Sequence, residues 1–257
     1  MKRFADKVVV ITGAASGIGL ATAERIAREG GKLVLIDIDG SALERSATML
    51  TGQDLTLCTA DVSREEDVRR YVDAAMSKHG QIDGFFNNAG IEGRQDRPTE
   101  AFGSEAFRQV LAVNLDGVFY GMAAVLEVMK EQRGGAIVNT ASVGGIRGIG
   151  NQAGYAASKA GGIGLMRNAV VEYGQYGIQI NTIAPGAIMT AMVERALRDL
   201  AGDDWQSMAR AFTERNPMRR AGTAEEVAAL VAFLLSGEAR YVNGVVIPID
   251  GGQSGQY

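Results

Sequence analysis

A run of β-branched residues that ends in a glycine-rich segment constrains the fold of this chain more than any other feature. Residues 7–11, a lysine followed by three valines and an isoleucine, are typical of a short strand buried on both faces of a parallel sheet. The segment Thr12–Gly19 follows directly, with glycines at positions 13, 17 and 19, and a helical pattern then runs from Leu20 to Arg28. Such glycines allow a tight turn and a close approach of the backbone to a diphosphate, whose charge a helix N-terminus favours.

Two interpretations of this glycine segment are open from its residues alone. Its spacing is G-x-x-x-G-x-G, which differs from the G-x-G-x-x-G fingerprint of the long-chain dinucleotide-binding proteins. The segment could be a tight turn between strand and helix that binds nothing. The order of buried strand, glycine loop and helix favours a dinucleotide site.

Apolar runs alternate with helical patterns along the rest of the chain. The expected strands are residues 7–11, 32–36, 55–60, 82–86, 136–140, 178–184 and 245–249, and the expected helices are residues 20–28, 41–50, 65–78, 104–132, 151–174 and 223–236. This alternation predicts an α/β fold, a single doubly wound Rossmann-type domain over residues 1–257 with a seven-stranded, mostly parallel sheet and helices on both faces. Residues 187–220 interrupt it with a helical pattern rich in methionine and charge, which predicts a small helical lid over a substrate.

Composition and charge exclude several classes of function. A formal net charge of -4, without any run of five like charges, argues against a nucleic-acid surface or a membrane patch. One histidine, His79, and one cysteine, Cys58, cannot assemble a zinc site or an intrachain disulfide, so we expect no bound metal. We expect that no apolar run reaches the length of a membrane span, and residues 8–11 are too short for a signal h-region, so we expect a soluble, cytoplasmic protein.

Polar residues follow several expected strands at their carboxyl ends, where open parallel sheets bind ligands. Asp37 lies about 20 residues beyond the glycine loop, where an acid hydrogen-bonds the ribose diol of a bound adenosine. Its charge would repel a 2′-phosphate, and no Arg or Lys in the loop or directly after Asp37 could receive one, so the sequence predicts NAD rather than NADP. The alternative role for Asp37, capping the next helix, suits Asp39 or Ser41 better. Asp61, at the end of the third strand, could contact the adenine.

Tyr155 and Lys159 are four residues apart in a helical pattern, so they share one face of the helix. An ammonium near a phenol favours the phenolate, and we expect the pKa of Tyr155 to fall from its free value of about 10. Tyr155 could then act as an acid or base near neutral pH. The alternative is that the pair belongs to a solvated helix face with no chemical role.

Together these motifs resemble those of the short-chain dehydrogenase/reductase family, and the resemblance covers essentially the whole chain. The family's T-G-x-x-x-G-x-G, N-N-A-G and Y-x-x-x-K motifs correspond to Thr12–Gly19, Asn87–Gly90 and Tyr155–Lys159. Asn114 and Ser142 occupy the remaining catalytic positions, and Pro185-Gly186 with Thr190 match the segment on the nicotinamide side. Within the family the chain is similar to the NAD-dependent cyclic-ketone reductases, notably over residues 139–192 and 248–254.

The resemblance implies an NAD(H)-dependent oxidoreductase that interconverts a secondary alcohol and its ketone. Tyr155 would exchange a proton with the substrate oxygen and Ser142 would hydrogen-bond that oxygen, while hydride passes between the nicotinamide and the substrate carbon. Lys159 would hold the nicotinamide ribose and lower the pKa of Tyr155, and Asn114 would hold a water that links Lys159 to solvent. The residues implied in NAD binding are Gly13, Ser16, Gly17, Ile18, Gly19, Asp37, Ile38, Asp61, Val62, Asn88, Ala89, Gly90, Tyr155, Lys159, Pro185, Gly186, Ile188 and Thr190.

A mainly apolar substrate pocket is expected beside these elements. Its candidate residues are Ser142, Val143, Ile146, Ile149, Gln152, Tyr155, Met189, Met192 and Trp205. For the methionines, packing between lid and core is an equally good alternative. The absence of an Arg or Lys clamp among these candidates disfavours sugar phosphates, acyl-CoA and carboxylates, which leaves hydrophobic secondary alcohols and ketones, cyclic ones first by resemblance.

Several alternatives stay open at this level. The substrate could be another one typical of the family, such as an acyclic diol, a diketone or a steroid. Epimerases and dehydratases also use Y-x-x-x-K, but they are usually longer and carry a large C-terminal substrate domain. A non-catalytic NAD(H) sensor would generally lack the tyrosine. The resemblance also implies a homotetramer built on the two long helices and the last strand.

Overall fold

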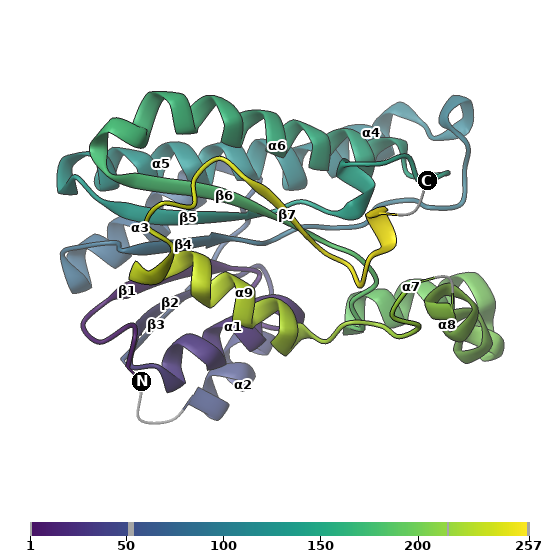
Figure 1. Cartoon of the computed structure of the whole chain (residues 1–257), viewed down its shortest axis with the longest axis horizontal. Helices are drawn as coiled ribbons and strands as arrows, with labels where there is room; N and C mark the ends of the chain where they lie inside the picture. The colour runs from purple at the N-terminus through teal and green to yellow at the C-terminus, as the bar shows by residue number, and fades with distance from the viewer. Residues whose placement is uncertain (1, 51–53, 215, 256–257) are drawn as a thin grey trace.

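Short apolar runs form the strands of one parallel sheet, which a computed structural model shows between two layers of helices (Figure 1). The structure describes residues 2–50, 54–214 and 216–255. Over these residues the strands are β1 (Val8–Thr12), β2 (Lys32–Asp37), β3 (Leu55–Thr59), β4 (Gly84–Asn87), β5 (Gly135–Thr140), β6 (Ile178–Pro185) and β7 (Val246–Ile249). Their order is β3-β2-β1-β4-β5-β6-β7, and every neighbouring pair is parallel. The predicted doubly wound α/β fold is therefore confirmed.

The order of the strands reverses between β1 and β4, and this point determines where a ligand can bind. From β1 the chain moves outward to β2 and β3, and it then returns to the other side of β1 for β4 to β7. In open parallel sheets the crevice at such a reversal, outside the carboxyl ends of the strands, receives the ligand. The glycine loop after β1 and the Asn-Asn segment after β4 flank that crevice.

Helices cover both faces of the sheet (Figure 1). On one face lie α1 (Gly17–Arg28), α2 (Gly40–Ala47) and α9 (Ala224–Leu235), and on the other lie α3 (Glu65–His79), α5 (Gly117–Gln132) and α6 (Ala153–Tyr173). Thr223 and Glu226 form a capping box at the start of α9, with Thr223 N donating to Glu226 Oε2 over 2.9 Å.

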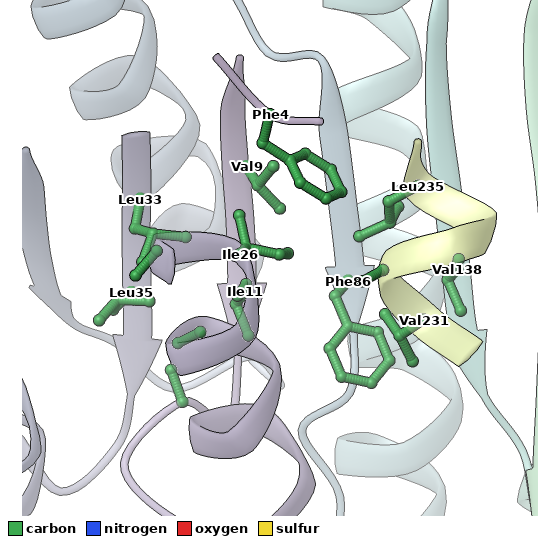
Figure 2. Close-up of a cluster of buried hydrophobic side chains, with 14 of the residues drawn as sticks. Phe4, Val9, Ile11, Ile26, Leu33, Leu35, Phe86, Val138, Val231 and Leu235 are labelled. Atoms are coloured by element: carbon green, nitrogen blue, oxygen red, sulfur yellow. The ribbon is translucent and has the colours of Figure 1, made fainter. Parts of the chain in front are cut away.

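The first strand carries apolar side chains into both layers, which explains why its sequence does not alternate. Val9 and Ile11 pack in the cluster under α1 and α9, whereas Val8 and Val10 pack in the cluster under α3, α5 and α6. Figure 2 shows the first cluster, in which Ile26 of α1 and Val231 of α9 lie over strand residues. Burying one such side chain contributes about 1.5–3 kcal/mol to the free energy of folding. The two clusters therefore hold the strand ends in register.

The region predicted as one helix over 104–132 consists of three parts. An α-helix, α4 (Ser104–Leu111), leads into a π-helical turn, η3 (Ala112–Asp116), and the α-helix resumes as α5. Asn114 lies inside the π-helical turn and is buried. A π-helical turn accommodates one extra residue in an α-helix and is frequent at functional sites.

The stretch Ser104–Gln132 is long and apolar enough to cross a membrane by length and composition alone. The expectation that the chain contains no such run was wrong by this criterion. About half of the stretch is buried inside the protein, where α5 packs against α3 and α6. Its apolar residues are therefore those of a core helix on one face of the sheet.

The helical pattern after β6 forms two helices that project beyond the carboxyl edge of the sheet (Figure 1). These are α7 (Ala191–Ala201) and α8 (Trp205–Glu214). Thr190 is the N-cap of α7, and its hydroxyl accepts the N–H of Val193 over 3.4 Å. The segment leaves the sheet at Pro185-Gly186 and returns to it at α9.

Candidate active site

The glycine loop packs its backbone so closely that side chains are excluded at defined positions. Gly13 and Gly17 have φ angles of 65° and 55°, a conformation that residues with a Cβ rarely adopt. A Cβ at Gly19 would collide with the carbonyl of Gly13, and one at Gly13 would lie 3.0 Å from Asn88 Nδ2. The loop backbone therefore turns tightly into α1, which begins at Gly17, three residues before the predicted start.

The N-terminus of α1 has the properties of an anion site. The hydroxyl of Ser16, the N-cap residue, makes no capping hydrogen bond in the described structure, and the first turn contains no acidic residue. The first N–H groups of a helix lack partners within the helix and carry partial positive charge. The loop also lies against the start of α7, because a Cβ at Gly17 would be 3.5 Å from the Thr190 methyl group. These residues fit the diphosphate of a dinucleotide.

Asp37 lies beside the glycine loop at the end of β2. Its Oδ2 accepts the N–H of Ala15 over 3.0 Å, and its Oδ1 accepts the N–H of Asp39 over 3.1 Å. Ile38, which follows, is 68% exposed. Asp39 caps α2 through the N–H of Ala42 over 2.9 Å, so the capping role falls on one of the two residues that the sequence indicated, Asp39 and not Ser41.

Asp61 and Val62 are oriented differently from Asp37. Asp61 Oδ1 accepts both the N–H and the hydroxyl of Ser63, over 2.9 and 2.7 Å, so the carboxylate turns back toward the start of α3. Val62 is buried and packs against Gly117 of α5. The hydrogen bonds that the structure gives Asp61 are those of a turn.

Asn88 joins the carboxyl ends of three strands. Its N–H donates to Thr12 Oγ1 over 2.9 Å, its Nδ2 donates to Thr12 O over 3.1 Å, and its Oδ1 accepts from Thr140 Oγ1 over 3.3 Å. Ala89 N donates to the same Thr12 hydroxyl over 3.1 Å. This network across β1, β4 and β5 fixes the glycine loop relative to the segment that carries Ser142.

Ser142, Tyr155 and Lys159 lie together at this edge of the sheet. Ser142 follows β5, and its Oγ accepts the N–H of Gly144 over 3.1 Å. It is also close enough to the Tyr155 phenol to act on its pKa as a hydrogen-bond partner. Lys159 is only 4% exposed, and its Nζ donates to Thr140 O over 2.9 Å and lies 5.6 Å from the centre of the Tyr155 ring.

The ionisation of this pair differs from the expectation drawn from the sequence. The pKa of Tyr155 was expected to fall beside Lys159, but burial raises it above its ordinary value of 10.0, and the Glu92 carboxylate raises it further against the opposing effect of Ser142. Burial also lowers the pKa of Lys159 from 10.5 to about 8. Removing these groups from water disfavours both charged forms.

Asn114 holds the segment after β4 in place from inside the π-helical turn. Its Oδ1 accepts the N–H of Ile91 and its Nδ2 donates to Ile91 O, both over 2.8 Å, and Nδ2 also lies 3.3 Å from Ser158 Oγ. Gly90 sits beside it, where a Cβ would be 3.1 Å from Asn114 Oδ1 and 3.3 Å from Lys159 Nζ. Gly90 therefore keeps the space next to the ammonium open.

The candidate substrate residues fall into different environments. Ser142, Ile149 and Gln152 surround Gly144, since a Cβ there would be 3.7, 3.6 and 3.2 Å from their nearest atoms. Ile146 and Met189 are partly exposed at this edge. Gln152 Nε2 donates to Gln95 Oε1 over 3.0 Å, so this part of the edge is polar.

Other candidates pack elsewhere. Val143 and Ile188 are buried, and Ile188 forms an isolated bridge with Gly222. The Arg198 guanidinium lies over the ring of Trp205, with its Cζ 4.5 Å from the ring centre. This contact joins α7 to α8. The side chain of Met192 lies outside the described residues. Pro185 ends β6, and the absent Cβ of Gly186 would lie 2.6 Å from Asp250 Cβ.

Glu92 and Gln95 belong to the site but were not found from the sequence. They lie in residues 91–101, a polar segment outside the expected strands and helices. Burial raises the pKa of the Glu92 carboxyl, and its charge acts on Tyr155. The one feature of the sequence that could have indicated these site residues is that Glu92 lies two residues beyond the Asn87–Gly90 segment. The expected apolar pocket is thus more polar than the sequence indicated.

The reversal of strand order, the glycine loop on a helix N-terminus and the grouped serine, tyrosine and lysine define a Rossmann-type oxidoreductase. The family profile described as "Enoyl-(Acyl carrier protein) reductase" matches residues 13–254. The levodione reductase of Leifsonia aquatica is 56% identical over 99% of this chain and 97% of that protein. The chain belongs to the short-chain dehydrogenase/reductase family, and it is an enzyme that interconverts alcohols and ketones.

The chain is also similar to one further relative and to two solved structures. The cyclohexanol dehydrogenase of Acinetobacter sp. (strain SE19) is 38% identical over 97% of this chain and 95% of that protein. A crystal structure of levodione reductase has a TM-score of 0.97 and 54% identity, covering 99% of this chain and 100% of that one. The crystal structure of NAD+-bound xylitol dehydrogenase has a TM-score of 0.93 and 36% identity, covering 98% and 100% of the two chains.

Lys159→Met should stabilise the cofactor-free protein while removing its activity. The pKa of Lys159 is about 8 in the folded protein against 10.5 for a free lysine. Folding therefore loses free energy to the desolvation of the ammonium, and this loss has its full size below pH 8. We expect the variant to gain up to about 3 kcal/mol in free energy of unfolding at pH 7. The gain should shrink as the pH rises from 8 to 10.5.

Urea unfolding between pH 6 and pH 10.5 measures this effect. Lys2→Met, at an exposed position, is the matched control and should show no such pH dependence. A Lys159→Met protein less stable than the parent at pH 7 would contradict the desolvation cost.

Proposed function

We propose that this chain is an NAD(H)-dependent reductase of cyclic, hydrophobic ketones that also oxidises the corresponding secondary alcohols. The observation that carries the proposal is the match to levodione reductase over 99% of the chain at 56% identity, together with the grouping of Ser142, Tyr155 and Lys159. The cyclohexanol dehydrogenase relative supports a ring-shaped substrate.

We assign the cofactor to NAD(H) on the position of Asp37. Its carboxylate borders the glycine loop through Ala15 N, where it would accept hydrogen bonds from the adenosine ribose and repel a 2′-phosphate. The xylitol dehydrogenase structure, which holds NAD+, supports the same choice. The loop from Gly13 to Gly19 would hold the diphosphate, and Asn88 to Gly90 with Pro185 to Thr190 would flank the nicotinamide.

In this proposal the chain's own residues control one proton. The nicotinamide, when bound, supplies or accepts the hydride. Tyr155 donates its phenolic proton to the ketone oxygen during reduction, and the burial that raises its pKa keeps that proton in place at neutral pH. Ser142 donates a hydrogen bond to the same oxygen. Lys159 would hold the ribose through the N–H donors that do not bond to Thr140 O. Asn114 would hold a water that connects Lys159 to solvent.

The rest of the chain would shape and cover the substrate. We assign residues 1–257 to one catalytic domain, with α7 and α8 as a lid whose position at the carboxyl edge supports that role. Ile146, Ile149, Gln152 and Met189 would contact the ring, whereas Trp205 would act through the packing of the lid.

We also propose a cytoplasmic homotetramer. Phe119 on α5 and Val171 on α6 are 51% and 83% exposed, which is high for large apolar side chains on the two long helices. Tyr241 and Val245, just before β7, are exposed as well. These positions support an assembly built on the long helices and the last strand.

Tyr155→Phe should abolish proton transfer without disturbing the fold. We expect kcat for ketone reduction to fall about 100-fold or more, because general-acid catalysis contributes on that scale. NADH binding, measured by fluorescence titration, should stay within about twofold. Tyr173→Phe, on the same helix, is the control and should keep full activity. Near-normal turnover by Tyr155→Phe would refute the proton-transfer role.

Asp37→Ala should weaken selection of NAD over NADP. Loss of the carboxylate removes a hydrogen-bond acceptor for the ribose and a charge that repels the 2′-phosphate of NADP. The KM for NAD should therefore rise about tenfold, while the KM for NADP changes less or falls. Steady-state kinetics with both cofactors measure the ratio. Asp39→Ala, which removes only the cap of α2, should leave the ratio unchanged. An unaltered ratio in Asp37→Ala would mean that another residue sets the preference.

A ketone panel tests the substrate class directly. We expect NADH oxidation with substituted cyclohexanones and cyclohexanediones at a kcat/KM about tenfold or more above that for acyclic ketones of equal carbon number. NADPH assayed alongside should be poorer. Tight NADH binding with no turnover across the whole panel would overturn the proposal in favour of a non-catalytic NAD(H) sensor.

A further inference from the structure

The last turn of α2 is hydrogen-bonded to the glycine loop. The hydroxyl of Ser46 donates to the carbonyl oxygen of Ala15 over 2.7 Å, between residues that are 31 apart in the sequence. Ser46 is only 7% exposed, so water does not readily replace this contact. The Ala15 carbonyl accepts no other hydrogen bond within the described part of the chain. A residue outside the glycine motif therefore takes part in setting the shape of the loop.

Ala15 is held from both sides. Its N–H donates to Asp37 Oδ2 over 3.0 Å, and its carbonyl accepts from Ser46. The C=O and the N–H of a trans peptide point in opposite directions, so Ser46 also directs the N–H of Ser16 away from α2. Ser16 is the N-cap of α1, beside the helix N-terminus that fits a diphosphate. The bond from Ser46 therefore determines where one of the donors of the loop points.

The position of Ser46 is itself fixed, because α2 is packed at its start and along its inner face. A Cβ at Gly40, the first residue of α2, would collide with the Thr59 hydroxyl at the end of β3. Leu43 is 1% exposed and packs in the same apolar cluster as Ala15. The Ser46 hydroxyl is therefore a donor at a fixed place and not the end of a flexible side chain.

A serine on the buried face of a helix has an unfavourable local effect. Serine is a poorer helix former than alanine, and its buried hydroxyl costs free energy unless it finds a partner. The partner that the structure shows is the Ala15 carbonyl, so the benefit of Ser46 lies in the glycine loop.

We propose that Ser46 is a positioning residue for the dinucleotide, which holds the peptide between Ala15 and Ser16 in its binding orientation before the cofactor arrives. The proposal rests on the proposed function, in which the glycine loop holds the diphosphate. A loop that is already ordered loses less conformational entropy when the ligand binds, and affinity rises accordingly. Since Ser46 bonds to Ala15 and not to Asp37, it acts on affinity and leaves the choice between NAD and NADP unchanged.

Binding titrations of Ser46→Ala test the proposal, with Ser41→Ala as the matched control. Ser41 is exposed on the same helix, so the control makes the same chemical change away from the loop. The Kd for NADH should rise about fivefold in Ser46→Ala, the effect of losing one hydrogen bond, and stay within about twofold in Ser41→Ala. ADP-ribose, which carries the diphosphate but no nicotinamide, should weaken by the same factor. Weaker NADH binding with unchanged ADP-ribose binding would place the effect outside the loop and overturn the proposal.

A second pair of variants keeps the test independent of whether a larger side chain fits. Ser46→Thr and Ser46→Val add the same branched shape and differ in one hydroxyl. The threonine variant should bind NADH about fivefold more tightly than the valine variant. Equal dissociation constants for the two variants would overturn the proposal.

Steady-state kinetics separate positioning from cofactor choice. In Ser46→Ala the KM values for NAD and NADP should rise by the same factor, with kcat at saturation within about twofold of the parent. A changed ratio of the two KM values, as expected for Asp37→Ala, would contradict the assigned role.

Urea unfolding of the cofactor-free variants distinguishes a purely structural role. A lower urea midpoint for Ser46→Ala with an unchanged Kd for NADH would mean that the bond only joins α2 to the loop, and would overturn the proposal. The proposed function fails in a different way: a parent protein that binds NADH and reduces no ketone would refute the reductase assignment. The titrations would still decide the role of Ser46.

Discussion

The structure of the site depends on a positive charge that the fold buries. Lys159 lies on a helix packed against the sheet, and burial alone lowers its pKa toward neutrality. The surrounding backbone compensates in part, because Thr140 O accepts a hydrogen bond from the ammonium and Gly90 leaves room beside it. A buried cation costs free energy of folding, and the hydrogen bond to Thr140 O offsets only part of that cost, since the pKa of Lys159 stays low.

The second requirement of the site is that the two halves of the sheet stay fixed in position relative to each other. The glycine loop follows β1 in one half, and Ser142 follows β5 in the other. Thr12 and Asn88 join them, since the Thr12 hydroxyl accepts two backbone N–H groups and the Asn88 amide bonds to both neighbouring strands. With these strand ends fixed, the loops beyond them can differ among relatives without moving the reacting groups.

Much of this arrangement could be predicted from the sequence, because its signals are local. The unbroken β-branched run before Gly13 indicates a strand covered on both faces, and the four-residue spacing of Tyr155 and Lys159 indicates a shared helix face. The pKa of Tyr155 could not be predicted, since desolvation depends on everything packed around the phenol. Glu92 was missed because loop residues carry no periodicity. Asn114 interrupts an apolar helical stripe and so allows for a local bend, but nothing in that pattern indicates a π-helical turn.

This π-helical turn has an evolutionary consequence. A π-helical turn corresponds to one residue more than the α-helix needs, so a single-residue deletion within Ala112–Asp116 would restore a regular helix. The deletion would turn α4 by about 100° relative to α5 and carry the Asn114 amide away from the main chain of Ile91. In evolution, substitutions along this helix should therefore be tolerated more easily than the loss of a single residue from the π-helical turn.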